Sequence, residues 1–230
     1  CPVENIYNML ETNVWMSSGA AQEQYIAVDL QTHLGYPAKS SDYLAVLGHN
    51  LKSVGALITL QYSADNLSWT DAFTAFLPQA DTVILKEFTN PGAYRHWRLK
   101  ITGMTDPAYM AVCTWGCKTE LDYATASYDP HAQEVRANVS LSCAGYVAGV
   151  HAMYTERSME IRFNDADASL YSMIKQWWET SGLKNFFVAW ESANSPEDVF
   201  LMRPDTRFSN PLNSGGAYRD VTIRLTGRKE

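Results

Sequence analysis

ALITLQYSADNLSWT, residues 56–70, is the stretch that decides how the first half of the chain is organised. Over residues 57–64 the bulkier apolar side chains alternate with smaller or polar ones, and this period of two is typical of a strand with one buried face. Asp65 and Asn66 then favour a tight turn, because both side chains bond their own backbone and both tolerate left-handed conformations. The sequence therefore predicts a β-hairpin that Trp69 closes.

Other short apolar runs flank this hairpin, and Gly, Pro, Asn and Asp separate them. In the run after the break Asn90-Pro91-Gly92, the side chains of Trp97, Leu99 and Ile101 share one face. No helix is convincing in this half, so the regular spacing of short strands indicates an antiparallel sandwich or jelly roll. We expect strands at residues 25–30, 42–48, 57–64, 71–76, 82–88, 94–102 and 108–115.

Length and charge limit the classes of function. A chain of 230 residues has room for one large β domain or two ordinary ones. Its net charge of -7, without a Lys/Arg cluster, argues against nucleic acid and against an anionic membrane surface as the main partner. No apolar run has the length of a membrane span, and we expect no signal peptide at the start of the sequence.

The sequence predicts no metal site and no cofactor. Four cysteines are too few for a disulfide scaffold in a chain of this length. Cys113 and Cys117 have a metal-like interval, but no His or Cys pair stands nearby at ligand spacing. The five histidines also lack ligand spacing; they are His33, His49, His96, His131 and His151.

No catalytic motif is present either, and we expect a protein that is not an enzyme. The sequence contains no nucleophile elbow, phosphate-binding loop or His-Glu-x-x-His motif. Glu160, Asp165 and Asp167 resemble paired carboxylates. They precede a predicted helix, however, and a helix N-terminus attracts acidic residues for electrostatic reasons alone.

Four short motifs follow one another in the first half: QYIAVDL (24–30), YLAVLGHNL (43–51), ITLQYSADNLSWT (58–70) and YRHWRLKITG (94–103). Together they resemble the galactose-binding-like, discoidin-type jelly roll, over roughly residues 12–115. The resemblance implies a jelly-roll fold and a module that contacts glycans. Secreted members often join their two ends by a disulfide, for which Cys1 and Cys117 are the counterparts here; the sequence leaves that pairing open.

The composition changes near residues 118–120, so we divide the chain into a jelly-roll domain at 1–117 and a second domain at 118–230. In the second domain Asn164 or Asp165 is expected to cap a helix that ends at Gly182. Its apolar positions recur at three- and four-residue steps and include Trp177 and Trp178. Strands are expected at residues 134–143, 153–163, 186–190, 199–203 and 218–226, which gives an antiparallel β domain with one helix.

This strand and helix pattern, with FFVAW (186–190) and the closing YRDVTIRLTGRKE (218–230), resembles the tail-tube and distal-tail family of tailed bacteriophages. The resemblance implies a β-sandwich flanked by one helix that assembles into a ring of identical copies. It further implies a place in the tail tip of the virion, assembled in the bacterial cytoplasm, with tail-tube, hub and tape-measure proteins as partners.

Candidate binding residues lie on loops, where a rigid frame commonly presents its sites. If the strands form a simple meander, the loops at 31–41, 63–70 and 89–94 share one end. His33, Tyr36, Asn66 and Tyr94 would then form a glycan site there, whereas Trp15 and Trp69 are expected in the core.

Trp177 and Trp178 are the candidate assembly residues. Because they are adjacent on a helix, they cannot both point inward equally well, so we expect one to pack on the sheet. The other would meet the edge of the core or a neighbouring subunit, since Trp is enriched in interfaces.

These observations support a structural tail-tip or baseplate subunit that forms a ring and contacts host glycans through its jelly roll. The alternative is a monomeric carbohydrate-binding adhesin or accessory module. An enzyme that acts on glycans is the third and most distant hypothesis.

Overall fold

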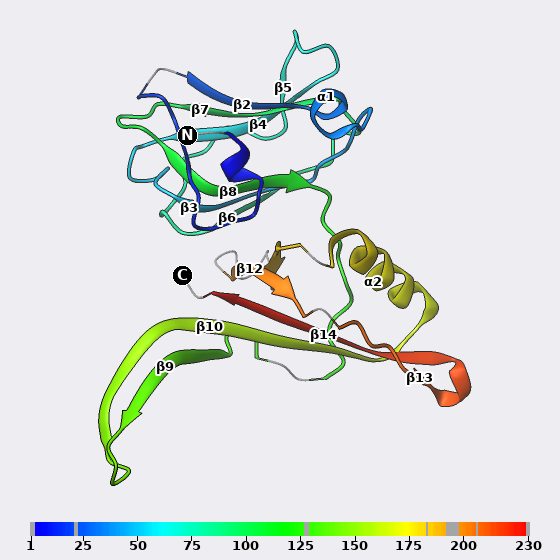
Figure 1. Cartoon of the computed structure of the whole chain (residues 1–230). Helices are drawn as coiled ribbons and strands as arrows, with labels where there is room; N and C mark the ends of the chain where they lie inside the picture. Colours follow the sequence, from blue (N-terminus) through cyan, green and yellow to red (C-terminus); the bar gives the residue numbers. More distant parts are fainter. Residues whose placement is uncertain are drawn as a thin grey trace. The chain divides into compact units, whose positions relative to one another are not determined.

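The computed structural model describes residues 3–20, 23–126, 129–182, 184–191, 198–205 and 207–228 (Figure 1). The chain divides into two compact units. The first is Cys1–Lys118 with Glu191–Val199, and the second is Thr119–Trp190 with Phe200–Glu230.

The first unit consists of two four-stranded antiparallel sheets, whose orders are β1-β8-β3-β6 and β2-β7-β4-β5. The predicted jelly-roll sandwich is thereby confirmed, with the quoted hairpin formed by β4 and β5. The strands are β1 (Trp15–Met16), β2 (Glu23–Asp29), β3 (Tyr43–His49), β4 (Leu57–Ser63), β5 (Thr70–Asp71), β6 (Ile84–Glu87), β7 (His96–Thr102) and β8 (Tyr109–Gly116). Two short helices accompany them, η1 (Val3–Ile6) and α1 (Leu30–Leu34).

The core of this unit lies between the two sheets. Trp97, Leu99 and Ile101 of β7 are all buried, as their shared face predicts. Trp15 is also buried, as expected. Trp69 is not a core residue: it is half-buried and packs on the guanidinium of Arg98, which alternates with the buried residues of β7 and so lies on the outer face of the sheet.

Other expectations for this unit were also wrong, among them the strand at 71–76, of which only Asp71 lies in a strand, β5. The strands are not a meander, since neighbours in each sheet are far apart in sequence; β1 pairs with β8, for example. Residues 31–41 are also not entirely loop, because α1 begins directly after β2. Asp29 caps it, with Oδ1 accepting from the Gln31 N–H at 3.1 Å, and Gly35 ends it with φ of 73°.

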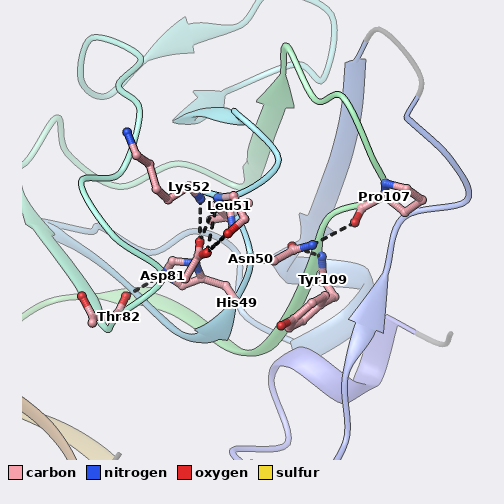
Figure 2. Close-up of polar contacts among 9 residues, drawn as sticks. His49, Asn50, Leu51, Lys52, Asp81, Thr82, Pro107 and Tyr109 are labelled. Atoms are coloured by element: carbon pink, nitrogen blue, oxygen red, sulfur yellow. Dashed lines mark hydrogen bonds and ion pairs between the residues drawn. The ribbon is translucent and has the colours of Figure 1, made fainter.

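The turn between β3 and β4 is held by buried polar contacts around His49 (Figure 2). The His49 Nε2–H donates to the Thr82 carbonyl at 2.7 Å, and Nδ1 accepts the Leu51 N–H at 3.2 Å. These two partners fix a neutral imidazole with its proton on Nε2. Asp81 lies 3.7 Å from Nδ1 and accepts the Lys52 N–H at 2.7 Å.

The same turn is tied to β8 through Asn50 (Figure 2). Its Nδ2 donates to the Pro107 carbonyl at 3.1 Å, and its Oδ1 accepts the Tyr109 N–H at 2.8 Å. These bonds fix the end of the sandwich that lies opposite the start of β3.

Burial lowers the pKa of His49, although the Thr82 carbonyl and Asp81 act in the opposite direction. The unfolded chain therefore takes up a proton at higher pH than the folded one. Stability contributed by neutral His49 is complete above about pH 6.5 and is lost as the pH falls toward the lowered pKa, by up to about 1.4 kcal/mol per pH unit. Urea unfolding of the first unit at about pH 7.5, 6.5 and 5.5 measures this slope.

In His49→Gln we expect the contribution of His49 to the pH dependence of the free energy of unfolding to disappear, because an amide does not titrate between about pH 5.5 and 7.5. His151→Gln, which changes an exposed histidine of the second unit, is the control and should keep the wild-type slope. An unchanged slope in His49→Gln would contradict the assignment.

The strands of the second unit form one antiparallel sheet in the order β11-β12-β14-β10-β9, with β13 also paired to β14. The predicted antiparallel β domain with one helix is confirmed. It is not the expected sandwich, because its described strands form a single layer with the helix packed on it. The strands are β9 (Gln133–Leu141), β10 (Val147–Ala166), β11 (Phe186–Ala189), β12 (Val199–Pro204), β13 (Leu212–Asn213) and β14 (Tyr218–Arg228). The helices are α2 (Ala168–Ser181) and the short η2 (Ser214–Gly216).

The helix α2 covers one face of this sheet through Leu170 and Ile174, which pack with Phe163 of β10. Its cap is Asp167, whose Oδ1 accepts the Leu170 N–H at 2.8 Å. The expected cap at Asn164 or Asp165 was wrong, because β10 continues to Ala166 and delays the start of the helix.

Candidate functional site

Three loops meet at one end of the first unit. His96, the first residue of β7, lies in register between Asp29, the last residue of β2, and Ser63, the last residue of β4. The segments that follow β2, follow β4 and precede β7 therefore emerge side by side. We call residues 30–41, 64–69 and 89–95 the loop cluster.

A bidentate ion pair joins two of these segments at their base. Arg95 Nε lies 2.8 Å from Asp29 Oδ1, and Arg95 Nη2 lies 2.7 Å from Oδ2. The Arg95 guanidinium holds the pKa of Asp29 well below its usual range. The backbone N–H of Asp29 donates to His33 Nδ1 at 3.1 Å, so His33 has its ring fixed beside this pair.

The same loops also carry aromatic rings and an ammonium group. The Lys39 Nζ is 3.6 Å from the centroid of the Tyr36 ring, which is 47% exposed. Lys39 also pairs with Tyr94 through two backbone hydrogen bonds of 3.0 and 3.1 Å. Tyr94 packs against Tyr62 in a tilted arrangement, with 4.3 Å between centroids and 41° between the ring planes. The buried Trp97 Nε1–H donates to the carbonyls of Lys39 and Tyr94.

Asn66 lies on the neighbouring turn, after β4. It has a left-handed φ of 62°, and its N–H donates to the Ser63 Oγ at 2.9 Å. Asp65 accepts the N–H groups of Ser68 and Leu67 at 2.9 Å each, and these bonds lower the pKa of Asp65 to about 2. The turn is therefore rigid, with the Asn66 side chain exposed.

The structure thus joins the segments of His33, Tyr36 and Tyr94 through direct contacts and places Asn66 on the adjacent turn. Their role in binding stays a prediction. Sequence reasoning missed Asp29 and Arg95 in this group. They are 66 positions apart, and only the register of β2 with β7 places them together.

Trp177 and Trp178 both have aromatic partners within the second unit. Trp177 meets Phe186 edge-on at 5.0 Å between centroids, and Trp178 stacks on Phe208 at 4.8 Å with 11° between the ring planes. Gly182 leaves room for Trp178, since a Cβ there would lie 2.5 Å from the Trp178 carbonyl oxygen. Both indoles are half-buried, and their role in assembly stays a prediction.

The acidic residues of β10 and α2 have structural partners. Glu160 accepts from Arg224 Nε at 2.9 Å and from Arg162, and these bonds lower the pKa of Glu160. Asp167 caps α2, as described above.

A second feature with functional potential is the hairpin of β9 and β10, which extends from the sheet of the second unit (Figure 1). β9 is the last strand in the described sheet order, and only β10 is its neighbour. Paired residues of an antiparallel ribbon share a face, so the register sorts its side chains. We call residues 133–157 the β9–β10 ribbon.

One face of the ribbon is apolar. Val139 pairs with Val150, Leu141 with Val147, and Ala137 with Ala152. The alternation places this face on the same side as Met159 and Phe163, which face the core farther along β10. Its large side chains remain more than half exposed: Val135 56%, Val139 55%, Leu141 61%, Val147 63% and Val150 65%.

The opposite face of the ribbon is polar. Asn138 pairs with His151, and Arg136 is bonded to Glu156 at 2.6 Å and to Glu134 at 3.1 Å. The ribbon is therefore amphipathic, although both of its faces are open to water.

The thiols of Cys113 and Cys117 differ in burial, and therefore in reactivity. Burial raises the pKa of the Cys113 thiol to about 12, so this thiol stays protonated. Cys117 is a free, exposed thiol whose Sγ lies 3.1 Å from the Ser40 Oγ. The pairing of Cys1 with Cys117 concerns a residue outside the described ranges.

Among the residues that the structure describes, His, Cys, Asp and Glu side chains do not gather in threes around a possible metal position. Within the same ranges, no helix has the length and apolar character needed to cross a membrane.

No protein-family model and no curated protein sequence matches the chain. Several solved structures are similar to about half of it. Chitosan-binding module 1 of a chitosanase/glucanase from Paenibacillus sp. IK-5 is 17% identical, with a TM-score of 0.40, covering 50% of this chain and 84% of that one. The CBM32 module of AlyQ, in complex with 4,5-unsaturated mannuronic acid, is 19% identical with a TM-score of 0.38, covering 50% and 86%. A CBM32 module from Clostridium perfringens in complex with GalNAc-β-1,3-galactose is 14% identical with a TM-score of 0.39, covering 47% and 78%.

Proposed function

We propose that this chain is a non-catalytic carbohydrate-binding protein and that the loop cluster of its first unit holds the sugar. The observation that carries the proposal is the convergence of three loops in register at one end of the sandwich. Sites for small ligands are concave or loop-built surfaces in which a few polar groups converge on a rigid frame.

The chemistry of the loop cluster suits a sugar ring. A pyranose presents C–H groups on its faces and hydroxyl groups around its rim. The exposed ring of Tyr36 offers an aromatic surface for the C–H groups. Donors and acceptors for the hydroxyl groups come from the ammonium of Lys39, the guanidinium of Arg95 and the carboxylate of Asp29.

Tyr36→Ala is expected to weaken glycan binding by about tenfold or more, because it removes the exposed aromatic surface. Binding of the whole chain and of the variant to a glycan array, followed by titration of the best glycan, measures this loss.

Tyr109→Ala is the matched control, since Tyr109 is also partly exposed but starts β8 at the opposite end of the sandwich. It should bind as the wild type does. Equal losses in the two variants, or no bound glycan at all, would contradict the proposal.

A second function is favoured by the β9–β10 ribbon. We propose that the second unit assembles with copies of itself, as a ring-forming subunit of a tailed-phage tail tip would. Five large apolar side chains on one face of the ribbon are more than half exposed. Exposed apolar patches of this kind typically mark contact surfaces, and a long edge strand is open to pairing.

A second copy is the occupant that this surface suits best. The apolar face continues the core-facing side of β10, so a neighbour's ribbon would extend an existing apolar layer. Burying the five side chains would contribute on the order of 5 kcal/mol, which is substantial for an interface. Under this proposal the protein is a virion component, and tail-tube, hub and tape-measure proteins would be its further partners.

A further inference from the structure

The outer face of the sheet β2-β7-β4-β5 carries a shallow depression away from the loop cluster. It has a volume of about 250 Å³. All four strands of this sheet and the segment after β5 contribute its lining. The lining residues are Glu23, Leu57, Thr59, Gln61, Asp71, Ala75, Lys100 and Thr102.

The register explains why these side chains meet. Thr102 lies between Glu23 of β2 and Leu57 of β4, and Lys100 lies beside Thr59. Residues directly opposite in a sheet point to the same face, and here they alternate with the buried side chains of the core.

Charged and polar groups form the walls. Lys100 Nζ lies 2.9 Å from Glu23 Oε1, with the two side chains 27% and 45% exposed. On the other side, Gln61 Nε2 donates to Asp71 Oδ1 at 2.6 Å. An ammonium has three donors and a carboxylate accepts at both oxygens, so both walls retain capacity for a ligand.

Arg98 stiffens the wall next to the depression. Its guanidinium carbon is 4.2 Å from the centroid of the Tyr25 ring and 4.0 Å from that of the Trp69 ring. Its Nε donates to Gln61 Oε1 at 2.7 Å. Both polar ends of Gln61, which is 8% exposed, are therefore fixed. This order is what a preformed binding surface requires.

Size and charge select the ligand. Two cations, Arg98 and Lys100, are balanced by two carboxylates, Glu23 and Asp71, so the surface favours a neutral ligand. Pockets for drug-sized ligands have about 300–1,000 Å³, so this one suits a single small ring. We propose that the depression is a second sugar site, which takes one neutral pyranose unit on the face of the sheet.

This proposal deepens the proposed function and rests on it for the class of ligand. The two sites lie at opposite ends of β7, whose six steps from His96 to Thr102 span about 20 Å. One glycan chain or two neighbouring chains can therefore engage both.

Ligand-observed saturation-transfer NMR on the full chain tests the proposal, with D-glucose, D-galactose and N-acetyl-D-glucosamine each as the probe. A single ring is expected to half-saturate on the order of 1–10 mM. Ala75→Trp places an indole at the exposed rim of the depression, and Ala80→Trp is the matched control at another exposed alanine. Thr102→Tyr is a second filling variant, in case the first one fails to fold.

In a Tyr36→Ala background, which weakens the loop cluster, we expect a saturable signal to remain. Adding Ala75→Trp should then raise the half-saturation concentration at least about tenfold, while Ala80→Trp should leave it unchanged.

If Tyr36→Ala removes the whole signal, only the loop cluster binds sugar, and the second site is refuted while the proposed function stands. If Tyr36→Ala has no effect and Ala75→Trp removes the signal, the second site stands and the loop cluster is not the glycan site. If no probe binds the wild type, both proposals fall.

Discussion

Val139→Lys will reduce the protein to its monomer mass of 25.8 kDa in light scattering, whereas the wild type will show a multiple of that mass. Val139 lies at the centre of the apolar face of the ribbon, opposite Val150. A lysine there would have to bury an unpaired charge between two copies. The expected cost of about 3 kcal/mol corresponds to a loss of more than about 100-fold in association.

Asn138→Lys is the control, because it puts the same charge on the next residue of β9 but on the polar face, opposite His151. It should keep the mass of the wild type. A monomeric wild type would contradict assembly through the ribbon, and equal effects of the two lysines would contradict the role of the apolar face.

Trp97→Ala is expected to destabilise the first unit by about 3–5 kcal/mol, the range found when a large buried aromatic is truncated. Trp97 is 1% exposed, and its Nε1–H supports the carbonyls of Lys39 and Tyr94. The truncation leaves a cavity and also releases two segments of the loop cluster. Urea unfolding followed by circular dichroism measures the free energy of the first unit.

Leu67→Ala is the control for this prediction, since Leu67 is 84% exposed on the turn after β4. It should change the free energy of unfolding by less than about 0.5 kcal/mol. A loss below about 1 kcal/mol in Trp97→Ala would show that the residue is not the support that its burial indicates.

The sequence predicts strands well where the pattern is local. The alternation around Leu99 predicts both β7 and its buried face, because the apolar side chains of one strand all point to the face that is buried. It does not predict strand order. The pairing of Trp15 with Met110 depends on the packing of two sheets, and no neighbouring residues encode it.

The start of α2 and the start of β10 also depend on strand pairing that the local sequence does not show. Asp165 and Asp167 are equally good caps by residue type, and the choice follows from how far β10 stays paired to β14. The sequence predicts a strand only from residue 153, but β10 already begins at Val147, because pairing with Leu141 outweighs the low strand preference of the small residues there.

For the candidate sites, the sequence predicts which loops carry aromatic and polar residues but not which charges lie among them. The loops do share one end, although the meander that suggested it was wrong. The reason is the register of Asp29, His96 and Ser63, which brings Arg95 to Asp29. The depression on the sheet face was missed, because its lining comes from strands whose order the sequence does not give.

The pairing of β9 with β10 shifts register twice, between Val147 and Gly149 and between Ala152 and Tyr154. Each shift inserts an unmatched residue into β10, which bends and twists that strand. A flat ribbon with an apolar face could pair with further copies without limit, in the cross-β arrangement of amyloid fibres. The two register shifts make the ribbon bent and twisted, so its edge pairs poorly with other chains. In the proposed assembly, these two extra residues therefore favour a closed ring of limited size over a fibre.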